Sequence, residues 1–292
     1  MAGVPFHLVD VFAERRYAGN QLAVVESRGS LSDEEMLDIT REMNYSETTF
    51  VEGDPVDGAW PVRIFTQKEE IPFAGHPTLG TAAVLRERFG AGDDVTLRLG
   101  AGDIPVEVRP DGSEGAEAYW MTQNAPEFGA ELEHARLARV LGLDEGDVDR
   151  EWPVQVVSTG LPSILVPLTG RDALGRVDVD RTAYHALYDE TGVENVFPFC
   201  ADPREDDHHL AARMFSPGHG LYEDPATGSA NGNLAGYLAR HRYFGDGEVA
   251  VSVEQGYEMG RPSVLHLEAE DGEEVSVRVG GRVESVAEGE LL

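Results

Sequence analysis

The chain has 292 residues, of which 41% are hydrophobic, a length and composition that suit two globular domains. Its 54 acidic residues against 23 basic ones give a formal net charge of −31, and Lys68 is the only lysine. The acidic residues are spread along the chain, which argues against nucleic acid as a partner because its phosphates would be repelled.

Further classes of protein are excluded by what the sequence lacks. No apolar run approaches the length of a membrane span, and the N-terminal segment lacks the basic region and apolar core of a signal peptide. We therefore expect a cytoplasmic protein with no membrane partner. Cys200 is the only cysteine, so an internal disulfide is excluded and the side chain is expected to be buried.

The acidity itself favours a halophilic protein. In molar salt the Debye length falls to about 3 Å, so the repulsion among the carboxylates is screened. A general acidic interaction surface is the alternative.

The first half of the chain is predicted to contain short strands and two helices. Ser32 and Glu35 form a capping box, which predicts a helix from about Asp33 to Met43. Pro77 suits the first turn of a second helix, rich in Gly and Ala, from about His76 to Arg88. The predicted strands lie at residues 5–11, 22–25, 48–51, 59–65, 95–99, 104–108 and 118–123.

The second half follows a predicted crossover at residues 124–129. Pro225 and Gly228 mark a turn into another Gly/Ala-rich helix, which Thr227 or Ser229 is expected to cap. Further helices are predicted at about 132–141 and 181–191. The predicted strands lie at residues 154–157, 163–166, 195–200, 209–215, 249–253, 264–267, 275–279 and 283–286.

The two halves share an ordered set of motifs. Arg63-Ile-Phe-Thr66 matches Arg213-Met-Phe-Ser216, and Gly75-His76 matches Gly228-Ser229 at nearly the same offset. Order and spacing favour a duplicated unit over chance similarity between Gly-rich turns. We therefore predict two similar domains, each with a sheet wrapped around its own Gly/Ala-rich helix.

The predicted domain boundary falls at the crossover. Residues 1–123 form an N-terminal domain that carries Glu47 and His76, and residues 124–281 form a C-terminal domain that carries Asp224 and Ser229. A C-terminal strand, at about 282–292, is free to return to the first domain. Such a duplication offers an interdomain cleft where both helix N-termini could meet, and clefts of this kind commonly bind small ligands.

Candidate site residues lie at the turns that enter these helices, because unpaired N–H groups and the helix dipole attract anions there. His76 is either a packing histidine or a neutral imidazole that binds a ligand or orients a carboxylate. Asp224 either caps the turn at Pro225 or is a carboxylate that takes part in proton transfer. Ser229 is either an N-cap or a ligand contact. By position alone, Glu47 is one solvated acid among many.

Signatures of cofactors and metals are missing from the sequence. There is no G-x-x-x-x-G-K-[ST] loop, no G-x-G-x-x-G after a strand and no G-x-S-x-G elbow, so neither nucleotide binding nor serine-hydrolase chemistry is predicted. His208-His209 has no spaced third ligand and is expected to be a solvated surface. We expect no cofactor and no metal.

Longer motifs extend over almost the whole chain. They include Gly19-Asn-Gln-Leu-Ala-Val-Val25, Tyr45-Ser-Glu-Thr-Thr-Phe-Val51, Pro72-Phe-Ala-Gly-His-Pro-Thr-Leu-Gly80, Ser158-Thr-Gly-Leu-Pro162, Glu223-Asp-Pro-Ala-Thr-Gly-Ser-Ala-Asn231 and Glu254-Gln-Gly256. As an ordered set they resemble the PhzF family of phenazine biosynthesis-like isomerases, within the diaminopimelate epimerase-like superfamily. The resemblance implies an α+β fold of two pseudo-symmetric domains, each a rolled β-sheet around a central helix. It also implies a homodimer and a cofactor-independent isomerase.

The resemblance further implies roles for single residues. Glu47 matches the family's catalytic glutamate, and His76 and Asp224 match accompanying active-site positions. In the epimerase branch of the superfamily a cysteine occupies each turn before a central helix; here His76 and Ser229 hold those places, which disfavours two-base thiol racemisation. The positions that match substrate-binding residues are Asn20, Gly75, Gly228 and Ser229.

The resemblance thus predicts an isomerase that moves a proton between carbons of a small carboxylate-bearing substrate, with Glu47 as general acid and base in the interdomain cleft. Two alternatives stay open. The first is an epimerase or racemase of a small amino or hydroxy acid that uses Glu47 with another acid such as Asp224. The second is a catalytically silent ligand-binding protein of the same fold.

Overall fold

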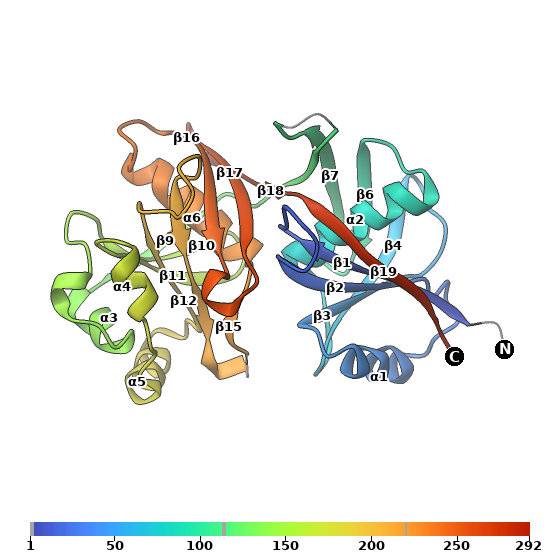
Figure 1. Ribbon diagram of the computed structural model, residues 1–292, viewed down its shortest axis with the longest axis horizontal. Coiled ribbons are helices and arrows are strands. Elements are labelled where there is room, and N and C mark those ends of the chain that lie inside the picture. Colours follow the sequence, from blue (N-terminus) through green and yellow to red (C-terminus); the bar gives the residue numbers. More distant parts are fainter. Residues whose placement is uncertain (1–2, 113–114, 220) are drawn as a thin grey trace. The chain divides into compact units, whose positions relative to one another are not determined.

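The computed structural model describes residues 3–112, 115–219 and 221–292. The chain forms two compact units, which are coloured by sequence in Figure 1. Unit 1 comprises Met1–Thr122 and Gly280–Leu292, and unit 2 comprises Gln123–Val279. Each unit is described by itself.

Unit 1 is a curved, mixed sheet around the helix α2 (Gly75–Phe89). Strands β19, β1 and β2 pair antiparallel, β2 and β3 pair parallel, and β3 and β4 pair antiparallel. The sheet continues through the parallel pair β4–β6 and the antiparallel pairs β6–β7 and β7–β8, and β5 pairs with β4. The strands are β1 (Val4–Val11), β2 (Asn20–Val25), β3 (Glu47–Val51), β4 (Ala59–Thr66), β5 (Glu70–Ile71), β6 (Asp94–Leu99), β7 (Gly102–Pro110), β8 (Glu117–Thr122) and β19 (Val283–Leu291).

Helix α2 is the core of unit 1. Every residue from 76 to 85 is buried, and the helix packs against β1, β2, β3, β6, β7, β8 and β19. Gly80 allows this close packing, because a Cβ there would lie 2.6 Å from a methyl group of Leu22 and 2.7 Å from one of Val11. The small residues of the helix therefore let the sheet wrap closely around it.

Helix α1 (Asp33–Met43) lies against the opposite face of the sheet. Its predicted capping box is confirmed: Ser32 Oγ accepts from the backbone N–H of Glu35, and the Glu35 carboxylate accepts from the backbone N–H of Ser32. The buried Met36 packs with Phe50 and Phe65 in a small cluster beneath the helix.

Unit 2 repeats this plan around the helix α6 (Gly228–His241). Residues 230–239 of α6 are all buried, and the helix packs against β10, β11, β16 and β17. Strands β9, β10 and β11 pair antiparallel, β11 and β12 pair parallel, and β13 and β16 pair parallel. The strands are β9 (Glu127–Leu132), β10 (Val154–Ser158), β11 (Pro162–Pro167), β12 (Asn195–Cys200), β13 (Leu210–Ala212), β14 (Met214–Ser216), β15 (Leu221–Asp224), β16 (Glu248–Gln255), β17 (Ser263–Asp271) and β18 (Val275–Gly281).

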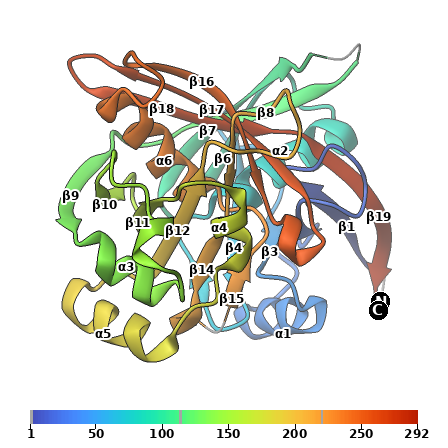
Figure 2. The same ribbon diagram turned by 60° about the vertical axis from the view of Figure 1, so that its left-hand side comes forward.

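Three short helices cover the other face of this sheet. They are α3 (His134–Val140), α4 (Arg171–Arg176) and α5 (Arg181–Thr191), and Figure 2 shows them in front of β11 and β12. Their apolar side chains, among them Leu137, Leu174 and Tyr184, form one buried cluster with the strands. The helix predicted over 181–191 is confirmed as α5.

The internal duplication is visible in the strand registers. In unit 1, Thr48 of β3 lies between Ala23 and Phe65; in unit 2, Val196 of β12 lies between Ile164 and Phe215. Both units therefore use the same parallel-then-antiparallel arrangement.

A pair of matching hairpins strengthens this correspondence. The guanidinium of Arg63 lies over the ring of Phe65 and bonds Glu70 on the next strand, at 2.8 Å. Arg213 lies over Phe215 and bonds Glu223 in the same way, at 2.7 Å. The predicted fold class is confirmed: two pseudo-symmetric units, each a rolled sheet around a central helix.

Some predicted elements were wrong. Residues 127–132, which include part of the predicted crossover and the predicted first residue of a helix, form the strand β9, and α3 begins only at His134. The predicted strand 209–215 is observed as two short strands, β13 and β14, and Arg213 between them donates its N–H to the Pro198 carbonyl of β12. Helix α4 was not predicted, since its six residues are too few to show a helical period.

Candidate active site

Glu47 and His76 lie side by side in unit 1. Glu47 is the first residue of β3, and His76 is the second residue of α2. The carboxylate Oε2 is 3.6 Å from the imidazole Nε2, and the side chains are 19% and 8% exposed. The structure thus places the predicted proton carrier beside the predicted helper, at the positive end of a central helix.

The imidazole of His76 is held neutral. Burial lowers the pKa of His76 to about 3, although a hydrogen bond with the backbone of Gln21 acts in the opposite direction. Asn20 is also buried, and its Nδ2 lies 3.4 Å from Nδ1 of His76. Asn20, predicted as a substrate contact, therefore faces the imidazole as well.

The N-terminus of α2 offers backbone donors and no charge of its own. Ala74 is the N-cap residue and has no side chain that could accept a hydrogen bond, and no acidic residue lies in the first turn. Gly75 and His76 supply the first N–H groups of the helix. Such an end attracts an anion such as a carboxylate.

The corresponding turn in unit 2 carries Asp224 at the end of β15. The prediction that Thr227 or Ser229 caps α6 was wrong. Thr227 occupies the N-cap position, but its hydroxyl donates to Oδ2 of Asp224 and makes no capping bond to the helix. Ser229, the second residue of α6, is half-buried, and Gly228 before it is buried.

Two amide side chains near this turn had no role in the sequence analysis. Gln255 of β16 bonds the backbone of Asp224 and of Thr227, and Asn231 of α6 bonds both Thr227 and Gln255. Gln255 falls within the quoted Glu254-Gln-Gly256 motif. That motif was the only signal in the sequence that could have singled it out.

The strand registers show that the two units present different groups at matching positions. Since Thr48 matches Val196, Glu47 matches Asn195, whose Nδ2 donates to the Pro162 carbonyl at 3.2 Å. Asp224 and Ile71 also match. Asp224 lies opposite Met214, the residue before Phe215, and Ile71 lies opposite Ile64, the residue before Phe65. Unit 1 therefore carries a carboxylate at the start of a strand and a histidine, whereas unit 2 carries a carboxylate at the end of a strand and a serine.

The remaining candidates for chemistry are accounted for by local structure. Burial raises the pKa of the Cys200 thiol to about 11, so this side chain is a poor nucleophile. His208 Nδ1 lies 2.9 Å from Oε1 of the buried Glu254. No cluster of metal-ligating side chains occurs within residues 3–112, 115–219 and 221–292.

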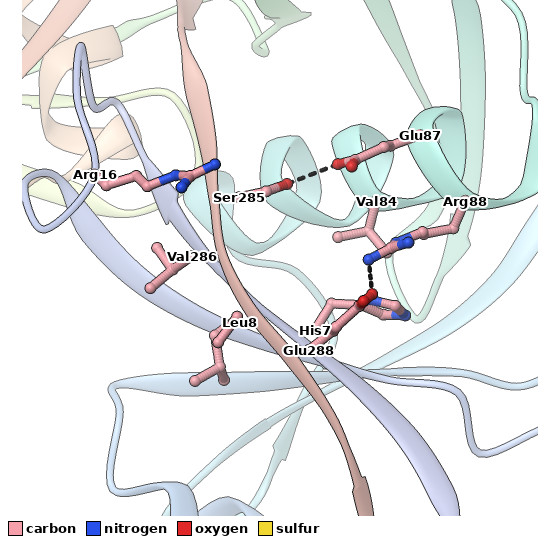
Figure 3. A pocket seen from close by; sticks show the side chains of 10 residues that line it. His7, Leu8, Arg16, Val84, Glu87, Arg88, Ser285, Val286 and Glu288 are labelled. Atoms are coloured by element: carbon pink, nitrogen blue, oxygen red, sulfur yellow. Dashed lines mark hydrogen bonds and ion pairs between the residues drawn. The ribbon is translucent and has the colours of Figure 1, made fainter.

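A surface pocket of unit 1 lies between β1, α2 and β19, away from these candidates (Figure 3). Ser285 donates to Glu87 across it at 2.6 Å, and Arg88 is paired with Glu288. Its lining includes none of the predicted site residues. We therefore assign no part of the chemistry to this pocket.

Comparison with known proteins identifies the relationship. A family model described as phenazine biosynthesis-like protein, PhzC-PhzF, matches residues 9–289. The chain belongs to the PhzF family. A Pseudomonas aeruginosa protein named trans-2,3-dihydro-3-hydroxyanthranilate isomerase is 39% identical over 285 residues, 97% of each chain. A Mesorhizobium japonicum protein named as an uncharacterized isomerase is 36% identical over 98% of this chain and 97% of its own length.

Solved structures agree with the assignment to the PhzF family. A Bacillus anthracis PhzF-family protein superposes with a TM-score of 0.91 at 27% identity, over all of both chains. A predicted epimerase from Pseudomonas aeruginosa gives 0.81 at 34% identity over 99% of each. A probable proline racemase from Agrobacterium radiobacter, 11% identical over 99% of this chain and 93% of its own, gives 0.61 and shares the fold. The chain is a PhzF-like isomerase.

No helix in the described part of the chain is long and apolar enough to cross a membrane.

Proposed function

We propose that this PhzF-family protein is a cofactor-independent isomerase that moves a proton between two carbons of a small carboxylate-bearing substrate. Glu47 is the proposed general acid and base. The observation that carries the proposal is the 3.6 Å approach of its Oε2 to the neutral His76, at the uncapped start of α2.

The proposed reaction needs one group that both takes and returns a proton. In its carboxylate form Glu47 takes a proton from a carbon next to an electron-withdrawing group, and it returns that proton at another carbon. A neutral imidazole beside it can bond the substrate without adding a positive charge that would hold the carboxylate in its ionised form. General acid–base transfer of this kind contributes roughly 10²- to 10⁴-fold in rate.

Substrate binding is proposed to use the helix ends. The N–H groups of Gly75 and His76 are suited to a carboxylate, because the helix dipole and the unpaired donors act together. Gly228 and Ser229 begin α6 in the same way, and we assign them to substrate binding with Asp224. The relative from Pseudomonas aeruginosa is named for a cyclic amino-hydroxy carboxylate, which supports a substrate of that chemical class.

Solvent deuterium uptake tests the proposal. The protein in D₂O and molar KCl would be given a panel of cyclic and acyclic carboxylates that includes trans-2,3-dihydro-3-hydroxyanthranilate, and mass spectrometry would follow both deuterium and isomer formation. We expect Glu47→Gln to reduce turnover at least about 10²-fold while ligand binding persists. Glu42→Gln is the control, since it neutralises an exposed glutamate of α1.

The outcomes separate the candidate functions. Near wild-type turnover by Glu47→Gln would remove Glu47 as the proton carrier. Inversion at one stereocentre without movement of a double bond would identify an epimerase. Calorimetric binding with no proton exchange for any bound compound would identify a ligand-binding protein that lacks the chemistry.

A further inference from the structure

The side chain of Gln255 fixes the turn between β15 and α6. Its Oε1 lies 3.2 Å from the backbone N–H of Thr227, and its Nε2 lies 2.8 Å from the backbone carbonyl of Asp224. A backbone N–H only donates and a carbonyl only accepts, so these two contacts determine which end of the amide is which. Gln255 is 1% exposed, and its orientation is therefore set by the fold.

The orientation of Gln255 also places a donor against the hydroxyl oxygen of Thr227. Its Nε2 also donates to Oγ1 of Thr227, at 3.2 Å. The Thr227 hydroxyl has a single proton, and this proton is directed to Oδ2 of Asp224. A carboxyl oxygen that faces a donor in this way accepts the bond and does not itself carry a proton.

We infer that Gln255 and Thr227 are positioning residues that act in series on Asp224: Gln255 orients the hydroxyl of Thr227, and this hydroxyl keeps Oδ2 of Asp224 as a hydrogen-bond acceptor. The inference rests on the proposed role of Asp224 in binding the substrate.

Two neighbouring residues hold this arrangement in place. Asn231, fully buried in the first turn of α6, donates to Oε1 of Gln255 at 2.9 Å and to the Thr227 carbonyl at 3.0 Å. Gly256 has a φ of +76°, and a Cβ there would lie 2.5 Å from the Pro225 carbonyl oxygen. The turn and the end of β16 are thus packed backbone to backbone, which keeps the three side chains in register.

Several charged groups on the surrounding elements form ion pairs with one another. The first turn of α6 contains no acidic residue. Ion pairs on β15, β16 and the adjoining segments include Glu223–Arg213, Glu254–His208, Glu254–Arg204 and Glu258–Arg204. None of these four pairs includes the Thr227 hydroxyl, which contacts Asp224 directly.

Carboxyl NMR tests the inference directly. Protein labelled with ¹³C at the aspartate Cγ would be titrated in constant molar KCl, and the Asp224 signal would be assigned by its loss in Asp224→Asn. We expect Thr227→Val to move the titration midpoint of this signal upward by about one pH unit, because a hydrogen bond to the ionised form is lost. Thr227→Ser keeps a hydroxyl and is expected to restore the wild-type midpoint.

Two further variants sharpen the result. Gln255→Leu removes the amide that donates to the Thr227 hydroxyl and adds no charge, so we expect it to move the midpoint in the same direction as Thr227→Val. Thr191→Val removes a hydroxyl that bonds the Leu187 carbonyl in α5 and should leave the signal unchanged. An unchanged midpoint in Thr227→Val, or a failure of Thr227→Ser to restore it, would overturn the inference. This readout does not use turnover, so it is independent of the Glu47→Gln result that tests the function.

Discussion

The burial of His76 has a measurable cost at low pH. Burial lowers the pKa of His76 from 6.5 to about 3, so between these values the unfolded chain binds a proton at this histidine and the folded chain does not. The free energy of unfolding therefore has its full contribution from the neutral His76 above pH 6.5, and it loses this contribution as the pH falls from 6.5 towards 3. Each pH unit in this window corresponds to about 1.4 kcal/mol.

Lowering the pH from 7.5 to 4.5 covers about two pH units of this window. Protonation of His76 in the unfolded chain should therefore lower the free energy of unfolding by roughly 2–3 kcal/mol. This is a large part of a typical total of about 5–15 kcal/mol. Replacing His76 by Asn removes the titrating group, and the variant should lose that much less stability over the same interval.

Urea unfolding followed by tryptophan fluorescence, at both pH values and in the same molar KCl, measures the difference. The many carboxylates of the chain titrate in both proteins and cancel in the comparison. His185→Asn serves as the control, since His185 is an exposed histidine on α5. Equal pH dependence in wild type and His76→Asn would refute the reasoning and show that the imidazole of the folded protein accepts a proton as readily as an exposed one.

Two other predictions concern packing and salt. Gly80→Ala should lower the free energy of unfolding by about 1–3 kcal/mol, because its Cβ would overlap the methyl groups of Leu22 and Val11. Gly175→Ala in α4 is the control: its Cβ would meet open space, so the variant should be neutral or slightly stabilising in the same urea assay. Dialysis from molar KCl into dilute buffer should unfold the chain, since a net charge of −31 is then poorly screened. Full retention of the circular dichroism spectrum and activity after prolonged dialysis would argue against the halophilic interpretation.

The parts of the fold that could be predicted are those with local causes. The capping box at Ser32 and Glu35 sets the start of α1 from within four consecutive residues, and the prediction was correct. The central helices follow from a turn and a Gly/Ala-rich segment. Strand β9 was missed because its side chains are mostly exposed and show no alternation. Edge strands of this kind have little hydrophobic pattern to detect.

The candidate site also has features that could be predicted from the sequence and features that could not. The resemblance selected Glu47 and His76, but their 3.6 Å separation arises from the packing of β3 on α2, which no local pattern describes. The position of Gln255 depends on a contact with Asp224 from a different strand and could not be read from spacing. The cap predicted at Thr227 failed for a related reason, because its hydroxyl accepts from Gln255 and donates to Asp224, two side chains that lie outside the helix.

The pairing of β19 with β1 has a consequence for synthesis of the chain. Residues of unit 2, Gln123–Val279, are continuous in sequence and are all synthesised before the strand β19 of unit 1. Unit 1 is translated first, yet it gains the strand Val283–Leu291 only after unit 2 has been made, so the edge of β1 stays uncovered until then. Unit 1, although it comes first in the sequence, therefore completes the sheet that carries Glu47 and His76 only after all of unit 2 has been made.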